Sequence, residues 1–130
     1  MIALDAHGGT GKTFVLSNLL SYVRSQGKIA LATATSGIAA NILEGGRTLH
    51  YRMKVPVEEI HDKSLCSIKD NSNLAKLLQK TSLLVIDECT MASKLVYETC
   101  DRSLRKILNN DKPFGGIQLI MCGDFCFVYM

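Results

Sequence analysis

The fold of this chain is decided by the stretch Ala6-His7-Gly8-Gly9-Thr10-Gly11-Lys12-Thr13 near its start. The stretch follows a short apolar run at residues 2–4 and leads into residues 12–26, where apolar side chains recur at helical spacing. This order predicts a strand, a glycine turn and a helix. Glycines let backbone N–H groups curl closely around an anion, and the dipole of the following helix attracts negative charge. We therefore predict a phosphate-binding loop formed by Gly8, Gly9, Thr10 and Gly11.

The end of this loop carries the two side chains that a nucleotide needs. Lys12 would reach the β- and γ-phosphates, and the Thr13 hydroxyl would ligate Mg²⁺. Ala6 stands where the strict pattern has glycine, and its Cβ is harmless if the residue keeps a negative φ. A glycine-rich turn that binds nothing is the alternative, but the Gly-Lys-Thr ending between a strand and a helix favours phosphate.

Strand and helix patterns alternate along the rest of the chain. Predicted strands lie at residues 29–32, 83–86 and 117–122, and predicted helices at 38–43, 72–80 and 93–108. Asn71 or Ser72 would cap the second of these helices. On the last helix, Glu98 with Arg102 and Asp101 with Arg105 are spaced to form ion pairs. The alternation predicts an α/β fold, with a parallel unit formed by the first two strands and the helix between them.

Composition excludes several other classes of protein. The 130 residues are 47% apolar with a net charge of +3, which suits one compact domain without a strongly basic tail. No apolar run is long enough to cross a membrane or to serve as a secretory signal, so we expect a soluble intracellular protein. The cysteines are odd in number and scattered, so we expect reduced, mostly buried thiols: Cys66, Cys89, Cys100, Cys122 and Cys126.

Two acidic residues supply what the phosphate loop lacks. Asp87 and Glu88 follow a buried strand at its carboxyl end. Asp87 would hold Mg²⁺ through its water shell, and Glu88 would polarise the attacking water. An Asp-Glu pair after an apolar run is by itself often only a strand leaving the core, but a phosphate loop upstream favours the catalytic role.

A third acidic residue follows the last predicted strand. Gly123, Asp124 and Phe125 stand at the end of an α/β sheet where ligands bind. Asp124 would either sense the nucleotide or merely cap the strand. Residues 47–70 show no clear period, and we regard this segment as a further candidate functional region.

Several further segments occur in a characteristic order. They are Gly27-Lys28-Ile29-Ala30-Leu31, Ser36-Gly37-Ile38-Ala39-Ala40, Gly45-Gly46-Arg47-Thr48-Leu49-His50, residues 82–88, Asn110-Asp111-Lys112-Pro113-Phe114-Gly115-Gly116 and Gly123-Asp124-Phe125. With these segments, nearly the whole chain resembles the Pif-type ATP-dependent DNA helicases of superfamily one, including helicase portions of plant and animal rolling-circle transposons. The resemblance implies a P-loop NTPase of RecA-like fold, a parallel sheet with helices on both faces, here with its centre kept and a flank missing. It places the last strand between those that precede Lys12 and end at Asp87.

The resemblance also implies an activity and its residues. The family uses ATP and Mg²⁺ to step five-prime to three-prime along single-stranded DNA, in DNA repair, recombination and telomere maintenance, in the nucleus or mitochondrion. Lys12 and Glu88 would be catalytic, Thr13 and Asp87 would hold the metal, and residues near the DNA would be Ser36, Gly37, Thr48 and His50. Hydroxyls, an imidazole and backbone amides can hold phosphates without reading sequence.

The chain also departs from the family pattern. Cys126 to Met130 replace the segment with a nucleotide-sensing Gln, and the adenine-recognising Gln has no counterpart before Met1. We expect residues 1–130 to form the first RecA-like domain alone, with the second domain and its arginine finger absent and little activity. Two alternatives stay open: a phosphoryl-transfer kinase, and a non-catalytic fragment that binds nucleotide, DNA or a partner through residues 47–70.

Overall fold

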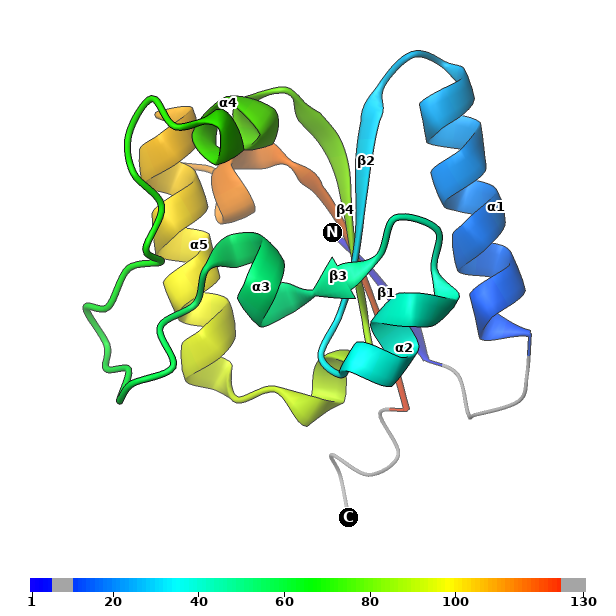
Figure 1. The fold of residues 1–130 in the computed structure, drawn as a ribbon, viewed down its shortest axis with the longest axis horizontal. Coiled ribbons are helices and arrows are strands. Elements are labelled where there is room, and N and C mark those ends of the chain that lie inside the picture. Colours follow the sequence, from blue (N-terminus) through cyan, green and yellow to red (C-terminus); the bar gives the residue numbers. More distant parts are fainter. Residues whose placement is uncertain (6–10, 125–130) are drawn as a thin grey trace.

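The computed structural model describes residues 1–5 and 11–124, and in this part five strands form one parallel sheet (Figure 1). The strands are β1 (Ile2–Asp5), β2 (Ile29–Ala34), β3 (Arg47–Thr48), β4 (Thr81–Asp87) and β5 (Gln118–Gly123). The helices are α1 (Lys12–Ser25), α2 (Gly37–Ile42), α3 (Leu49–Met53), α4 (Asn73–Gln79) and α5 (Lys94–Leu108). Two short 3-10 turns, η1 (Cys89–Met91) and η2 (Pro113–Gly116), flank α5. The predicted α/β class is confirmed.

The sheet has the strand order β1-β5-β4-β2-β3. The last strand, β5, lies between β1 and β4, as the resemblance implied. Consequently β1 and β2 are parallel but not neighbours, and β2 pairs with β4 instead. At the carboxyl ends, Ala34 of β2 pairs with Asp87 on one side and with Thr48 on the other. The sheet topology therefore brings segments that are distant in the sequence to one edge.

Helices cover both faces of the sheet (Figure 1). On one face, alternate strand residues Ala30, Ala32, Leu83 and Val85 belong to the same cluster as Leu16 and Leu20 of α1. On the other face, Leu31, Leu84, Ile86 and Leu119 pack with buried residues of α3, α4 and α5. Successive residues of a strand point to opposite faces, so the continuous apolar run of β4 fills both cores.

The two long helices use their apolar residues differently. On α5, Val96, Cys100 and Leu104 are buried at helical spacing. On α1, Leu16 and Leu20 are buried, but Val15 is 47% exposed and lies outside the core. The apolar pattern therefore predicted both helices correctly, and it overestimated how much of α1 the sheet covers.

The two ion pairs expected on α5 have different outcomes. Arg105 lies 2.9 Å from Asp101, which confirms that pair. The prediction that Glu98 pairs with Arg102 is wrong. Glu98 lies 3.4 Å from Lys94 instead, and Arg102 donates to the carbonyl of Ser64 at 2.9 Å. The Arg side chain has five N–H donors and can bind backbone carbonyls of a distant loop. The spacing of charges along one helix does not predict such a contact.

Residues 47–70, which lacked a clear period, contain β3 and α3. Gly46 lies directly before β3, where only glycine fits, because a Cβ there would lie 2.1 Å from the Ala40 carbonyl oxygen. Ser72, one of the two residues expected to cap α4, accepts a hydrogen bond from Ala75 N. Cys66, Cys89, Cys100 and Cys122 are buried free thiols, and Cys126 lies outside the described residues. Within the described ranges, no helix has the length and apolar character that a membrane span requires.

Candidate nucleotide and nucleic-acid site

The candidate site lies where the central strands end. Gly11 precedes α1 with φ +81°, a conformation that glycine adopts without strain. Because Gly11 has no side chain to cap the helix, the first-turn N–H groups of α1 depend on another acceptor, such as a phosphate oxygen. Thr13 lies in this turn and is partly buried. The predicted loop residues Gly8, Gly9 and Thr10, together with Ala6, lie outside the described residues.

Lys12 and Asp87 form a buried ion pair. Lys12 Nζ lies 2.9 Å from Asp87 Oδ1, and the two side chains are only 18% and 5% exposed. Burial lowers the pKa of the Lys12 ammonium, but its hydrogen bond to Asp87 and the attraction between the two charges outweigh burial and raise that pKa above its ordinary value. Each charge therefore compensates the other in a place where an isolated charge is costly.

Glu88 takes a left-handed backbone conformation directly after β4, with φ 52°. Its own N–H donates to Asp87 Oδ1 at 2.7 Å. A non-glycine residue at positive φ is strained, and here the strain turns consecutive carboxylates in different directions. Asp87 faces Lys12, and the Glu88 carboxylate accepts a hydrogen bond from Ser36 Oγ at 2.8 Å.

The hydroxyls that follow β2 hold Glu88. Ser36 Oγ donates to Glu88 Oε2 and also accepts from Ala39 N, so the same hydroxyl caps α2. Thr35 Oγ1 donates to the Glu88 carbonyl at 2.7 Å. Sequence reasoning assigned Ser36 only to DNA and overlooked Thr35. The available signal in the sequence was the pair of hydroxyl residues, Thr35 and Ser36, that follow a predicted strand.

Of the other predicted DNA residues, Gly37 follows Ser36 after β2, and Thr48 and His50 lie one strand further along the same edge. Gly37 begins α2, and Thr48 accepts a hydrogen bond from Tyr51 N and so caps α3. His50 lies in the first turn of α3 and is exposed. Since Ala34 pairs with both Asp87 and Thr48, the structure brings the predicted nucleotide and DNA residues to neighbouring strand ends.

Asp124 lies just beyond the carboxyl end of β5. β5 runs between β1 and β4, so Asp124 is close to the same edge as Asp87. The end of β5 passes close to η1, since a Cβ on Gly123 would lie 3.3 Å from Cys89 Sγ. This position suits either of the two roles proposed for Asp124.

The side chains at the site fit Mg²⁺ that is shared with a ligand. The Thr13 hydroxyl and the Asp87 carboxylate are hard oxygen donors of the kind this ion prefers. Among the described residues, no cluster of three or more His, Cys, Asp or Glu could hold a metal ion alone. The ion would therefore take its remaining ligands from phosphate and water, as is usual for Mg²⁺ beside a nucleotide.

A parallel α/β sheet with a Gly-Lys-Thr helix start and an Asp-Glu strand end defines a RecA-like P-loop NTPase domain. The model of the PIF1-like helicase family matches residues 1–129, so the chain belongs to that family. ATP-dependent DNA helicase Pif1 of Psychrobacter sp. is 33% identical over 125 residues, which cover 95% of this chain and 19% of that protein. ATP-dependent DNA helicase RRM3 of Saccharomyces cerevisiae is 35% identical, over 90% of this chain and 16% of that protein.

Solved structures agree with this family. The structure of Bacteroides Pif1 bound to single-stranded DNA has a TM-score of 0.81 and 35% identity, over 94% of this chain and 28% of that one. The complex of Bacteroides sp. Pif1 with ADP-AlF4 has a TM-score of 0.79 and 36% identity, over 95% of this chain and 28% of that one. The chain thus spans less than a third of the proteins it matches here.

Proposed function

We propose that this chain is the first RecA-like ATPase domain of a DNA helicase that uses ATP and Mg²⁺ to move five-prime to three-prime along single-stranded DNA. The family supports this proposal, as do the nucleotide-analogue and DNA complexes of its structural relatives. The observation that carries it is the 2.8 Å hydrogen bond between Ser36 Oγ and Glu88 Oε2. This bond joins the proposed water-activating carboxylate to the helix that would face DNA.

Each side chain has a distinct part in the proposed reaction. On nucleotide binding, the Lys12 ammonium would move from Asp87 to the phosphates. The ion pair would thus be replaced by phosphate at Lys12 and by Mg²⁺ at Asp87. Mg²⁺, when bound, would neutralise charge on the phosphates. The Glu88 carboxylate, held by Ser36, would orient the attacking water and accept its proton. DNA seated on α2 would act on that water through the same hydroxyl.

Further parts of the proposal concern the whole protein. The chain spans 19% and 16% of the two helicases compared above, so a second RecA-like domain would supply the arginine finger and the rest of the DNA channel. We place the protein in the nucleus or mitochondrion, where it would serve DNA repair, recombination and telomere maintenance. Its family favours helicase over the kinase alternative.

The test compares nucleotide binding with turnover in the 130-residue chain. We expect binding of a fluorescent ATP analogue with Mg²⁺ and very slow phosphate release, because an arginine finger contributes ~10³–10⁵ in rate. Glu88→Gln should keep the affinity within about twofold and lower turnover at least about tenfold. Glu98→Gln on α5, which also removes one carboxylate, is the matched control and should change neither.

Two outcomes would contradict the proposal. Rapid, DNA-stimulated phosphate release by the 130 residues would show that no second domain is needed. Unchanged turnover in Glu88→Gln would remove Glu88 from the reaction.

A further inference from the structure

A groove between α3 and α4 lies beside the predicted DNA residues. Its volume is about 420 Å³, and it is lined by His50, Tyr51, Arg52, Lys54 and Leu74. The groove follows from the short helix α3, in which Leu49 and Met53 are buried one turn apart and anchor it to the core. Of the residues between them, His50 and Tyr51 are exposed and Arg52 is half-buried. Among the described residues, no acidic side chain lines the groove.

The two cations of this groove, Arg52 and Lys54, form no ion pair with any residue that the structure describes. Arg52 Nε is buried and makes no hydrogen bond in the described part of the chain. Lys54 is exposed, and within the same residues neither cation forms an ion pair. A buried N–H without an acceptor is costly, so the groove favours a ligand that brings an acceptor, ideally an anion.

Backbone hydrogen bonds hold the groove wall at Lys54. The carbonyl of Lys54 accepts a hydrogen bond from Ser67 N at 2.9 Å, and its N–H donates to Tyr51 O at 3.4 Å. Lys54 takes a left-handed conformation with φ 50°, which ends α3. The backbone is thus held on both sides while the ammonium stays in solvent, an arrangement that limits the entropy lost on binding.

An aromatic ring distinguishes this groove from a simple basic patch. Tyr51 lines it and is 68% exposed. Phosphate-binding cations beside an exposed aromatic ring are what proteins use for single strands, whose bases stack on the ring. An acidic protein segment would satisfy the cations without using the ring.

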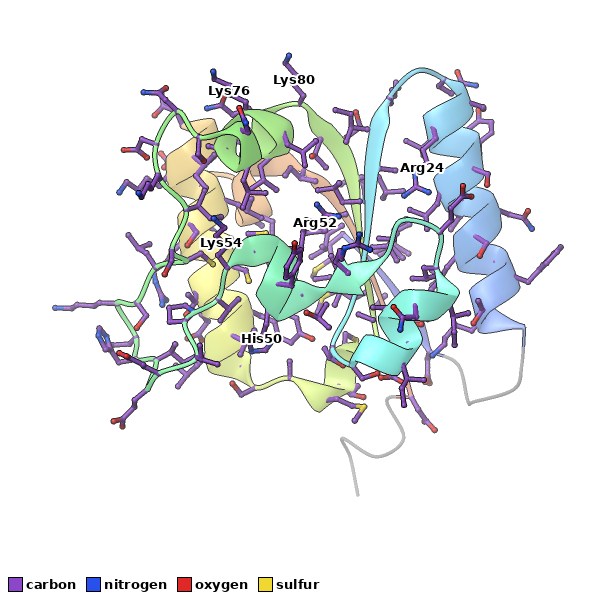
Figure 2. The ribbon with its side chains drawn as sticks, viewed as in Figure 1. Arg24, His50, Arg52, Lys54, Lys76 and Lys80 are labelled. Atoms are coloured by element: carbon purple, nitrogen blue, oxygen red, sulfur yellow. The ribbon has the colours of Figure 1, made fainter. Side chains whose placement is uncertain are left out.

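Other basic residues on the same side of the molecule do not share this geometry. Figure 2 shows Lys76 on α4 and Lys80 directly after it, both pointing away from α3, and neither lines the groove. Arg24 is occupied, because its Nη2 donates to the Ala30 carbonyl at 3.0 Å and its Nη1 to the Glu44 carbonyl at 3.2 Å. Among the described basic residues, Arg52 and Lys54 are therefore the ones that line the groove beside His50 and form no ion pair.

We propose that this groove extends the DNA site past His50, with Arg52 and Lys54 contacting the phosphodiester backbone and Tyr51 stacking on one base. The inference rests on the proposed function, because the strand that enters the groove is the one that passes Thr48 and His50. It adds a segment of DNA contact on α3 that does not touch the nucleotide site.

The test is fluorescence anisotropy of the whole chain with a labelled thymidine oligonucleotide, of roughly twelve nucleotides, over a range of salt concentrations. The double variant Arg52→Gln/Lys54→Gln should weaken binding about tenfold and reduce the slope of log K against log salt by about 1.4, or 0.7 for each lost phosphate contact. The double variant Lys76→Gln/Lys80→Gln removes the same charge and should change affinity less than about twofold. Lys54→Gln alone, at an exposed side chain, gives a variant whose folding is not at risk.

A separate variant tests the aromatic contact. Tyr51→Leu should weaken thymidine binding about fivefold and leave the salt slope unchanged, since a stacked base carries no counterion. With an abasic oligonucleotide of equal length, the same substitution should have no effect.

Equal losses of oligonucleotide affinity in the two double variants would overturn the proposal that DNA binds in this groove. Displacement of the oligonucleotide by polyglutamate as effectively as by unlabelled DNA would also overturn it. Failure of the wild-type chain to bind the oligonucleotide would overturn it as well. ATP binding, measured in parallel with the fluorescent analogue, separates that result from failure of the proposed ATPase function.

Discussion

The two halves of the candidate site treat charge in opposite ways. In the nucleotide half, Lys12 and Asp87 are nearly enclosed and lie 2.9 Å apart. In the DNA half, His50 and Lys54 are exposed, and Lys54 forms no ion pair among the described residues. Buried charges must be compensated within the fold, whereas water stabilises exposed ones until an anion arrives. Removing a charge from the nucleotide half should therefore lower both ligand binding and the free energy of unfolding. Removing one from the DNA half should lower ligand binding alone.

The largest effect is expected when one partner of the buried pair is removed. Lys12→Ala should weaken ATP-analogue binding more than about 100-fold, because it removes a charged phosphate contact, and lower the free energy of unfolding by about 3 kcal/mol, because Asp87 is left buried without its cation. Titration with the fluorescent analogue and urea unfolding measure the two effects. His50→Ala is the control from the DNA half and should change neither, while weakening DNA binding.

Removing both charges sharpens this comparison. The double variant Lys12→Ala/Asp87→Asn should recover much of the lost free energy of unfolding without recovering nucleotide binding. If Lys12→Ala proves as stable as wild type, the idea that the nucleotide half ties function to stability is wrong.

A smaller effect concerns pH. Burial of the Cys122 thiol, reinforced by the charge of Asp87, raises its pKa to about 11 from an ordinary value of 9.0. Above pH 9 the unfolded chain loses this proton while the folded chain keeps it, so the free energy of unfolding falls as pH rises from 9 to 11 and is unaffected by this thiol below pH 9. The loss approaches about 1.4 kcal/mol per pH unit within that window.

Urea unfolding at several pH values, for wild type and Cys122→Ala, measures this contribution. The variant has lower stability overall because a buried side chain is shortened, but its decline between pH 9 and 11 should be shallower. Parallel pH curves for the two proteins would contradict the assignment to Cys122.

The smallest expected effect falls on the residue that joins the two halves. Ser36→Ala removes the cap of α2 and the donor to Glu88, so the free energy of unfolding should fall by about 1 kcal/mol and phosphate release several-fold. Ser72→Ala removes an equivalent cap from α4, far from the site, and should cost similar stability without changing phosphate release. Equal turnover in the two variants would show that the Ser36–Glu88 bond is only structural.

Local patterns predicted the elements well because helix and strand periods depend on neighbouring residues. The helix at α5 and the buried strand β4 followed directly from apolar spacing. Two side-chain pairings could not be found in this way. Ser36 and Glu88 are 52 residues apart, and Arg102 bonds to a loop 38 residues away instead of to Glu98. Contacts between distant segments depend on strand order, which periodicity does not contain.

The segment 47–70 shows the same limit from another side. Its two-residue strand β3 is too short for any period. Gly46, directly before β3, lets the backbone pass close to Ala40. Once β3 pairs with β2, Thr48 and α3 are brought to the site edge. The groove beside α3 follows from this placement and has no signature in the residues around it.

The amino-acid sequence by itself determined the α/β class, the Gly-Lys-Thr start of the first long helix at Lys12 and the acidic strand end at Asp87 and Glu88. These features depend on residue type and on spacing within single elements, and such information is local. Only the tertiary structure decided that Lys12 pairs with Asp87 and that Ser36 holds Glu88. It also decided that two cations without an ion pair in the described part of the chain line a groove beyond His50. The physical reason is that a parallel sheet sets strands side by side in an order different from their order in the chain, and side chains then interact across its edge.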